Sequence, residues 1–510
     1  MDAFSGLSAG AGLLLVLALL LAYSFEFVNG FHDTANAVAT VIYTKALRPW
    51  QAVIWSGCWN LIGVLIASGA VAYGILALLP VELVLNVGSG AGFAMVFALL
   101  VSAIIWNVGT WYFGLPASSS HTLIGAIMGV GLANSLLSPG HVFGEGVNWA
   151  KVTQTGQALL FSPIIGFVIS GLLLLIFKLV LQKRPELFKP PAGDQPPSLW
   201  VRALLVLTCT GVSFSHGSND GQKGMGLVML ILIGVVPGVF AINPALGGDA
   251  LVAFNSSSKA TQAIIDKNVP TAYRGARAVV ASTGTVPPLS TADPNGTLSK
   301  YLKAGAKADG ATWAALAATN KALGSTTASV PSLGQLAAPN RKELRSEAYL
   351  VGASLAKLQS QHLIAAADDN KQLSAYRKQL DSVTNFIPVW VKVLTALCLG
   401  LGTMIGWKRI VVTVGERIGK AHLTYAQGAS AEMVAWGTIQ LADSFGLPVS
   451  TTHVLSSGVA GTMAANGSGV QGKTIMNIIL AWVLTLPVCV FLGSMLFAGA
   501  LLFLAKIGVH

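Results

Sequence analysis

Long apolar runs dominate this sequence and constrain its fold more than any other feature. They lie at 11–29, 51–79, 93–113, 122–136, 157–181, 203–215, 224–242, 387–407, 427–445, 454–466 and 475–504. Of the 510 residues, 53% are hydrophobic and 10% are charged, whereas soluble domains carry about 25% charged residues. A membrane-spanning helix needs about 20 apolar residues. We therefore expect an all-α polytopic membrane protein that places much of its surface in the lipid bilayer.

Several of these runs are too short to cross a bilayer and lie beside clusters of Gly, Pro and Ser. Broken or re-entrant helices have this pattern, and they are tolerated where they face protein or a water-filled cavity. The net charge is +11, but Lys and Arg gather in short loops between apolar runs, as in cytoplasmic loops of membrane proteins. This placement argues against nucleic-acid binding.

The pattern divides the chain into five segments. We expect a first membrane repeat at 1–182, a basic cytoplasmic loop at 183–202, the start of a second repeat at 203–242, a polar extramembrane insert at 243–386 and the remainder of the second repeat at 387–510. Within the insert, good helix formers with helical periodicity predict helices.

The sequence lacks the signatures of an enzyme. It contains no HExxH string, and its GxSxG match at 6–10 and Walker A match at 467–474 do not follow the predicted strands that those sites need. Its four cysteines stand singly in apolar stretches. No zinc or redox pair is indicated. We expect no catalytic residues, no cofactor and no resident metal.

One string occurs twice. Residues 114–121 read GLPASSSH and residues 446–453 read GLPVSTTH. In each copy a Pro is predicted in the first turn of a helix, followed by three hydroxyl residues. Hydroxyl groups beside free backbone N–H groups, at the positive end of a helix dipole, form an anion site without any cationic side chain. The triplets could equally be ordinary helix caps, but interrupted helices at matching positions of two halves point to a transporter's midplane site.

A second pair of segments places an Asp beside an apolar run. Residues 30–36 read GFHDTAN and residues 217–223 read GSNDGQK, each in a Gly-rich stretch that we expect to break a helix. Carboxylates at membrane depth are costly and suggest function. An ionised Asp accepts a hydrogen bond from the P–OH group that phosphate keeps near neutral pH, but it repels fully ionised sulfate.

Together these strings resemble the inorganic phosphate transporter (PiT) family, in its bacterial low-affinity, proton-coupled branch. The resemblance covers roughly 11–242 and 387–504 and does not extend to the insert. It implies about 10–12 transmembrane elements in two inverted repeats, with two re-entrant helical hairpins and a midplane phosphate site. It also implies a multi-pass protein of the bacterial cytoplasmic (inner) membrane that imports inorganic phosphate by proton symport.

By position, the resemblance assigns these substrate-binding residues: Asp33, Asn36, Ser118, Ser119, Ser120, Asp220, Ser450, Thr451 and Thr452. We add Lys223 to them because of its charge. Two positions depart from the family signature, because His32 and Lys223 stand where it has Asn. In sodium-coupled relatives the paired Asp and Asn residues are expected to hold sodium. The fixed ammonium of Lys223 would replace that charge, which favours protons over sodium.

Five further residues are candidates for coupling: His32, Asn219, His121, His453 and Glu26. The last three could carry protons or have structural roles. The sequence also leaves open a sodium-coupled phosphate or sulfate permease, phosphate travelling as a neutral complex with a divalent metal ion, and a homodimer.

Overall fold

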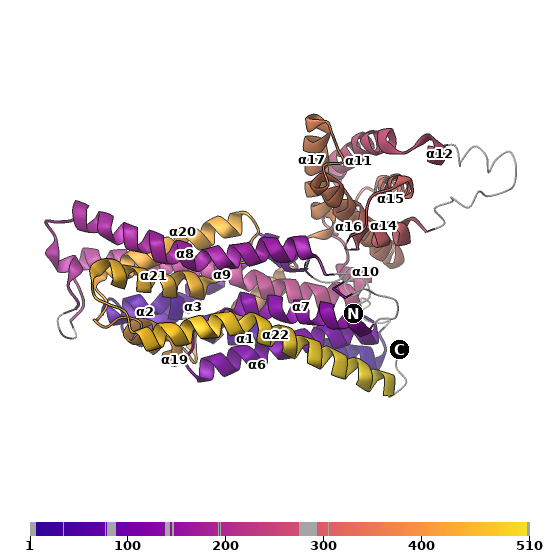
Figure 1. Cartoon of the computed structure of the whole chain (residues 1–510). Helices are drawn as coiled ribbons and strands as arrows, with labels where there is room; N and C mark the ends of the chain where they lie inside the picture. The colour runs from indigo at the N-terminus through magenta and orange to yellow at the C-terminus, as the bar shows by residue number, and fades with distance from the viewer. Residues whose placement is uncertain are drawn as a thin grey trace, which may run out of the picture.

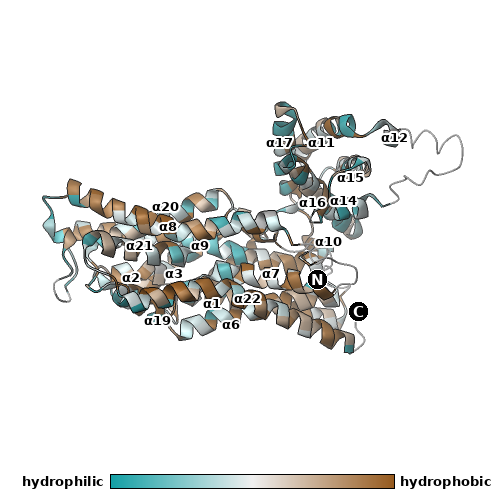
Figure 2. Cartoon of the chain, viewed as in Figure 1, coloured by the Kyte–Doolittle hydropathy of each residue, from teal (hydrophilic) through white to brown (hydrophobic). Residues whose placement is uncertain are grey.

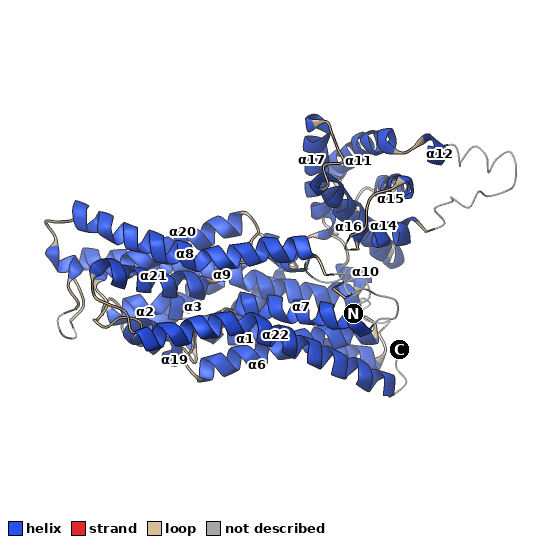
Figure 3. Ribbon diagram, in the orientation of Figure 1, coloured by secondary structure: helices blue, strands red, loops and turns tan. Residues whose placement is uncertain are grey.

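The described part of the chain consists of helices joined by short connections. The computed structural model describes residues 7–506 apart from 34, 77, 79–87, 138–142, 145–146, 192, 194, 275–292 and 304. Within these ranges the extended backbone pairs only in two isolated bridges, so no sheet forms there (Figure 3). This confirms the all-α class.

A bundle of long helices forms the larger body of the molecule (Figure 1). Its principal helices are α1 (Ala9–Asp33), α3 (Pro49–Ile66), α6 (Gly90–Tyr112), α8 (Trp149–Val180), α9 (Leu199–Val235), α18 (Val389–Met404) and α22 (Gly472–Lys506). Six helices of the described chain are long and apolar enough to cross a membrane, or up to eight if two bent pairs each count as one span. Hydrophobic residues predominate along the helices of the bundle (Figure 2). The chain is therefore a multi-pass membrane protein.

The two ends of the bundle differ in charge. The helices α2 (Ala35–Tyr43) and α19 (Lys408–Val412) and the connection between α8 and α9 lie at one end, opposite the two termini and the insert (Figure 1). Three basic clusters of the sequence belong to that end: Lys45 and Arg48, the Lys and Arg residues of 183–202, and those of 408–420. The excess of Lys and Arg in short cytoplasmic loops therefore predicts that this end faces the cytoplasm and that the insert faces outward.

Cysteine labelling tests this orientation. Both Arg184 and Lys371 have exposed side chains, at the basic end and on the insert respectively. In a variant without native cysteines, we expect a membrane-impermeant maleimide to label Lys371→Cys in right-side-out vesicles and Arg184→Cys only in inverted ones. Labelling of Lys371→Cys only from the cytoplasmic side would reverse the orientation.

Two helical hairpins enter the bundle from opposite ends. In the first, α6 is followed by α7 (Ser119–Leu137), and its turn lies at the basic end, where Thr413 Oγ1 donates to Gly114 O at 2.8 Å. In the second, α20 (Tyr425–Ser444) is followed by α21 (Thr451–Asn466), and its turn at Gly446 lies against Ala70, the first residue of α4 (Ala70–Leu76). The two turns are therefore built alike but point in opposite directions.

Both turns correct one detail predicted from the sequence. Gly114 and Gly446 adopt φ of +66° and +63°, a region that glycine enters without steric cost. The residues that follow run without helical structure as far as Ser119 and Thr451, so Pro116 and Pro448 precede the helices and do not lie in their first turns.

Helix contacts repeat between the two halves of the bundle. Helix α8 packs on α20 and α21, as α22 packs on α6 and α7. Likewise α1 packs on α6 and α18, as α9 packs on α20 and α3. These exchanged contacts and the opposed hairpins are what a duplicated, inverted arrangement predicts, and they support our inference of two inverted repeats.

The expected break at 217–223 does not exist. Helix α9 is continuous over 37 residues, which is about 55 Å of helix. Its glycines allow close packing instead, since a Cβ at Gly217 would meet the backbone of Asn60 and one at Gly224 would meet Glu26. Asp220 therefore lies within a long helix, unlike Asp33, which ends α1.

The segment between α9 and α18 forms a helical body with its own buried core. Its helices are α10 (Pro237–Phe240), α11 (Gly248–Asn268), α12 (Thr271–Arg274), α14 (Pro294–Leu302), α15 (Gly310–Ala328), α16 (Ala338–Ser360) and α17 (Ala367–Thr384). The last two confirm the helices predicted there. This body is far more hydrophilic than the bundle (Figure 2).

Candidate functional site

Asp33 is the point on which the two hairpins converge. Its carboxylate accepts a hydrogen bond from Ser119 Oγ of the first hairpin at 3.0 Å and one from Thr452 Oγ1 of the second at 2.6 Å. His32 Nδ1 lies 3.2 Å from Asp33 Oδ1, and the other ring nitrogen of His32 lies 3.1 Å from Thr110 Oγ1. A single carboxylate thus connects the end of α1 with both repeated hydroxyl strings.

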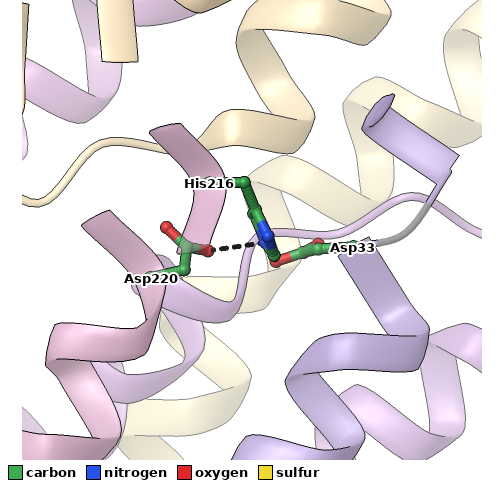
Figure 4. Close-up of side chains that lie close together, drawn as sticks. All are labelled: Asp33, His216 and Asp220. Atoms are coloured by element: carbon green, nitrogen blue, oxygen red, sulfur yellow. Dashed lines mark ion pairs between the residues drawn. The ribbon is translucent and has the colours of Figure 1, made fainter. Parts of the chain in front are cut away.

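His216 joins the two aspartates. Its Nε2 lies 3.7 Å from Asp33 Oδ2 and 3.4 Å from Asp220 Oδ2, and Figure 4 shows the imidazole beside both carboxylates. Its Nδ1 lies 2.8 Å from Asn60 Oδ1, and the amide nitrogen of Asn60 donates to Thr403 Oγ1 at 3.1 Å. Both nitrogens of the His216 ring therefore face oxygen acceptors, as in a protonated imidazolium that donates on both sides.

Lys223 completes the charged cluster. Its Nζ lies 2.8 Å from Asp220 Oδ1, and both side chains are buried. Residues 216, 220 and 223 share one face of α9, because residues three and four apart are neighbours on a helix. With His216 protonated, the two aspartates are balanced by two cations.

The hydroxyl triplets divide their roles. Ser118 and Ser450 are helix caps, whose oxygens accept the backbone N–H of His121 at 3.3 Å and of His453 at 3.1 Å. Ser120 Oγ donates to the carbonyl of Val449 at 2.9 Å and so links the two hairpins. The capping interpretation thus holds for the first position of each triplet, while Ser119 and Thr452 face Asp33.

The remaining predicted binding residues lie around this cluster. Thr451 is buried at the first position of α21, and the side-chain amide of Asn219 donates to Leu447 O of the second turn at 3.1 Å. Asn36 belongs to α2, but its side chain lies outside the described part of the structure. The first signature segment therefore contributes His32 and Asp33 to the described site.

The other coupling candidates flank the site on two sides. The rings of His121 and His453 stack 4.7 Å apart, and His453 stacks on Trp482 at 4.1 Å, directly behind the hydroxyl triplets. Glu26 is fully buried and faces Gly224 of α9. Asn29 lies near Glu26, yet neither side chain makes a hydrogen bond of normal geometry to a described group. Among the described contacts, no hydrogen bond or ion pair joins the network of Asp33, His216, Asp220 and Lys223 to the two stacked histidines or to Glu26.

Reasoning from the sequence missed two groups and the partners of a third. His216 stands one turn before Asp220, so helical spacing could have indicated it. Asp443 accepts hydrogen bonds from Ser218 and Gln222, both at 2.7 Å, and fixes α20 against α9. Glu432 accepts from hydroxyl groups of two other helices, at Thr40 and Thr208. No sequence pattern predicts the partners of Asp443 and Glu432, because these partners lie far away along the chain.

The arrangement can hold a tetrahedral oxyanion. Two helix N-termini face each other, and their dipoles and hydroxyl groups favour negative charge. A buried Asp between them accepts hydrogen bonds. The ligand atoms of Asp33, His216 and Asp220 also lie within 4.8 Å of one another, a spacing that a cation could bridge. The site thus combines anion binding with a carboxylate pair whose charge must be balanced.

Comparison with known proteins gives a consistent result. The model of a family described as "Phosphate transporter family" matches residues 29–493. The low-affinity inorganic phosphate transporters PitA and PitB of Escherichia coli strain K12 are each 42% identical to this chain, over 98% of it and 99% of the relative. A solved structure entitled "The sodium-dependent phosphate transporter" has a TM-score of 0.50 at 18% identity, covering 95% of this chain and 98% of that one.

Proposed function

The chain belongs to the phosphate transporter family, and on that premise we propose that it imports inorganic phosphate by proton symport across the bacterial cytoplasmic membrane. One observation carries the proposal. Two opposed helix N-termini bring their hydroxyl groups to Asp33, His216 connects Asp33 to Asp220, and Lys223 pairs with Asp220. Relatives that are named as transporters support transport rather than an enzymatic activity.

The hydroxyl groups and Asp33 have complementary parts in selecting phosphate. Ser119 and Thr452 donate to the Asp33 carboxylate in this structure, and the same hydroxyl groups are placed to donate to phosphate oxygens. Asp33 would then accept the P–OH proton of the substrate. Sulfate offers no such donor, so bringing it beside the carboxylate would cost repulsion without a hydrogen bond.

Competition experiments test this selectivity. We expect excess unlabelled phosphate to abolish uptake of labelled phosphate by cells that express the protein, while equal sulfate lowers it only in part, because a buried charge left unpaired discriminates strongly. We expect Asp33→Asn to lower phosphate uptake. Sulfate and phosphate should then inhibit the remaining uptake equally. Equal inhibition of the wild type by both anions would contradict the assigned role of Asp33.

The charges around the carboxylate pair of Asp33 and Asp220 favour protons over sodium as the coupling ion. Lys223 lies against Asp220, and His216 lies between both aspartates, so two cationic side chains occupy the surroundings where a sodium ion would otherwise be needed. Imidazole is the side chain that gains and loses a proton most readily near neutral pH. We therefore assign the travelling proton to the His216 and Asp33 pair.

The spacing of Asp33, His216 and Asp220 supports one alternative, a sodium-coupled phosphate or sulfate permease. A sodium ion there would have to displace the His216 proton or the Lys223 ammonium. For this reason we place sodium coupling second.

The coupling candidates differ in how closely they approach this cluster. His32 touches Asp33 and Asn219 touches the second turn, so we assign both to positioning. Glu26, buried without a normal hydrogen bond, would hold its proton in this conformation because an ionised carboxylate there would be costly. We propose Glu26 as a proton relay and the stacked His121 and His453 as structural. A neutral complex of phosphate with a divalent metal ion and a homodimer are both compatible with this function.

A further inference from the structure

A large cavity lies between the helical insert and the end of the bundle beneath it. Its volume is about 830 Å³. Tyr73 of α4, Trp149 of α8 and Ile233 of α9 belong to its floor, while α16 and α17 of the insert form much of the opposite wall. The cavity is therefore enclosed by both bodies of the protein and exists only because the insert packs over this end.

The walls of this cavity are strongly basic. Five cationic side chains line it: Lys303, Lys342, Arg345, Lys357 and Arg377. Among the described residues of the lining, Asp381 is the one acid. Such a concave, single-sign surface with low-dielectric walls concentrates counter-ions and raises their rate of association.

Several of these cations are held in place by neutral groups. Arg345 Nη1 donates to the carbonyls of Ala241 and Thr384, each at 2.9 Å, and Lys357 Nζ donates to that of Lys303 at 2.8 Å. Arg377 Nη1 donates to Gln359 Oε1 at 3.0 Å. Carbonyl oxygens fix a cation without neutralising it, so the positive charge stays available to an anion.

Burial also changes the pKa values of these cationic side chains, because their neighbours do not supply enough negative charge to replace the lost water. Loss of water lowers the pKa of Arg345, of Arg377 and of Lys357 from their ordinary values. For Arg377 the carboxylate of Asp381 opposes this effect. A bound anion would restore the pKa values by supplying the missing negative charge.

The cavity lies in line with the central site. Ile233, in its floor, comes ten residues after Lys223 on the continuous helix α9, which corresponds to about 15 Å along the axis. The basic loops lie at the other end of the bundle, so the cavity belongs to the end that we expect to face outward. An anion entering from that side would meet the cavity before the hydroxyl hairpins.

We propose that this basic cavity is a second phosphate site, which recruits inorganic phosphate from outside before it enters the central site. The inference rests on the proposed function for the direction of travel, while binding itself can be tested without transport. The recognised chemistry is a phosphate oxyanion, which could come from inorganic phosphate or from a phosphate ester. We assign it to inorganic phosphate, because the cavity leads toward a site built for that anion.

Binding is measured by equilibrium dialysis of radiolabelled phosphate against the purified full-length protein. In Ser119→Ala with Thr452→Val, which disables the central site, we expect phosphate still to bind and sulfate to compete, because fixed cations do not require a P–OH donor. Adding Lys342→Gln and Arg377→Gln should remove this binding. Persistence of the binding in the four-fold variant, or its absence before those changes, would overturn the proposal, as would binding of glycerol 3-phosphate but not of inorganic phosphate.

Uptake provides a second measurement with a matched control. Lys342→Gln with Arg377→Gln should raise the KM for phosphate by about three- to tenfold at low ionic strength and leave the maximal rate unchanged, because steering alters capture and not turnover. The control is Lys371→Gln with Lys378→Gln, which removes the same charge from exposed positions of α17 outside the cavity. Equal KM values in the two double variants would contradict a local site. Thermal melting of both double variants separates this result from loss of folding.

Discussion

Replacing Ser119 by Ala together with Thr452 by Val should abolish phosphate uptake and leave the protein folded in the membrane. Both hydroxyl groups donate to Asp33, one from each hairpin. A hydrogen bond to a charged group contributes about 1.5–3 kcal/mol, so loss of both should lower uptake by more than about 100-fold. Uptake of labelled phosphate into cells, normalised to membrane-inserted protein, measures the effect.

The matched control removes two other buried hydroxyl groups. Ser102 and Ser162 donate to carbonyls of their own helices, at Leu99 and Leu159, and lie outside the hairpin N-termini. We expect Ser102→Ala with Ser162→Ala to keep uptake within about twofold of the wild type, since such bonds contribute little net free energy. If the two double variants transport equally well, the hairpin N-termini do not form the substrate site.

Lys223→Asn should eliminate proton-driven uptake. Its ammonium lies 2.8 Å from Asp220, and charges about 4 Å apart interact by about 4 kcal/mol at an effective dielectric of 20. Without it, two aspartates and an entering phosphate share one buried site with a single remaining cation on His216. Lys223→Arg keeps the charge, but its planar fork does not fit a position made for a compact ammonium. We expect Lys223→Arg to retain more uptake than Lys223→Asn and less than the wild type.

A stability measurement distinguishes loss of charge from loss of fold. Breaking a buried ion pair costs about 3–5 kcal/mol, so Lys223→Asn should also melt at a lower temperature. Sodium should partly restore that melting temperature, because the ion can replace the missing charge beside Asp220, and potassium at equal ionic strength should not. A Lys223→Asn protein that transports normally on a proton gradient would disprove the role of Lys223.

The central elements of the site could be predicted because their signals are local. The hydroxyl string is contiguous and occurs in two copies, so the sequence alone identifies residues 118–120 and 450–452. The same holds for Asp33 and Asp220, which stand out as acids beside apolar runs. The polar insert was equally visible, since its composition differs from that of the bundle.

The other features of the fold and the site depend on tertiary contacts, which the sequence does not show. Glycines around Asp220 suggested a broken helix, but close packing of α9 on α3 and α1 uses those glycines and keeps the helix intact. His216 bridges two aspartates that lie 187 positions apart, which spacing along one helix cannot reveal. Only the folded hairpins show that Ser118 and Ser450 are caps while Ser119 and Thr452 face Asp33. The basic cavity likewise depends on how the insert packs over the bundle.

Uptake of phosphate into proteoliposomes, with each ion gradient imposed alone, tests the central claim most directly. The purified wild-type protein is reconstituted, and labelled phosphate is supplied with an inward proton gradient in sodium-free buffer or an inward sodium gradient at equal pH on both sides. The arrangement of Asp33, His216, Asp220 and Lys223 predicts accumulation with the proton gradient and none with sodium. Accumulation that requires sodium and ignores the proton gradient would contradict it.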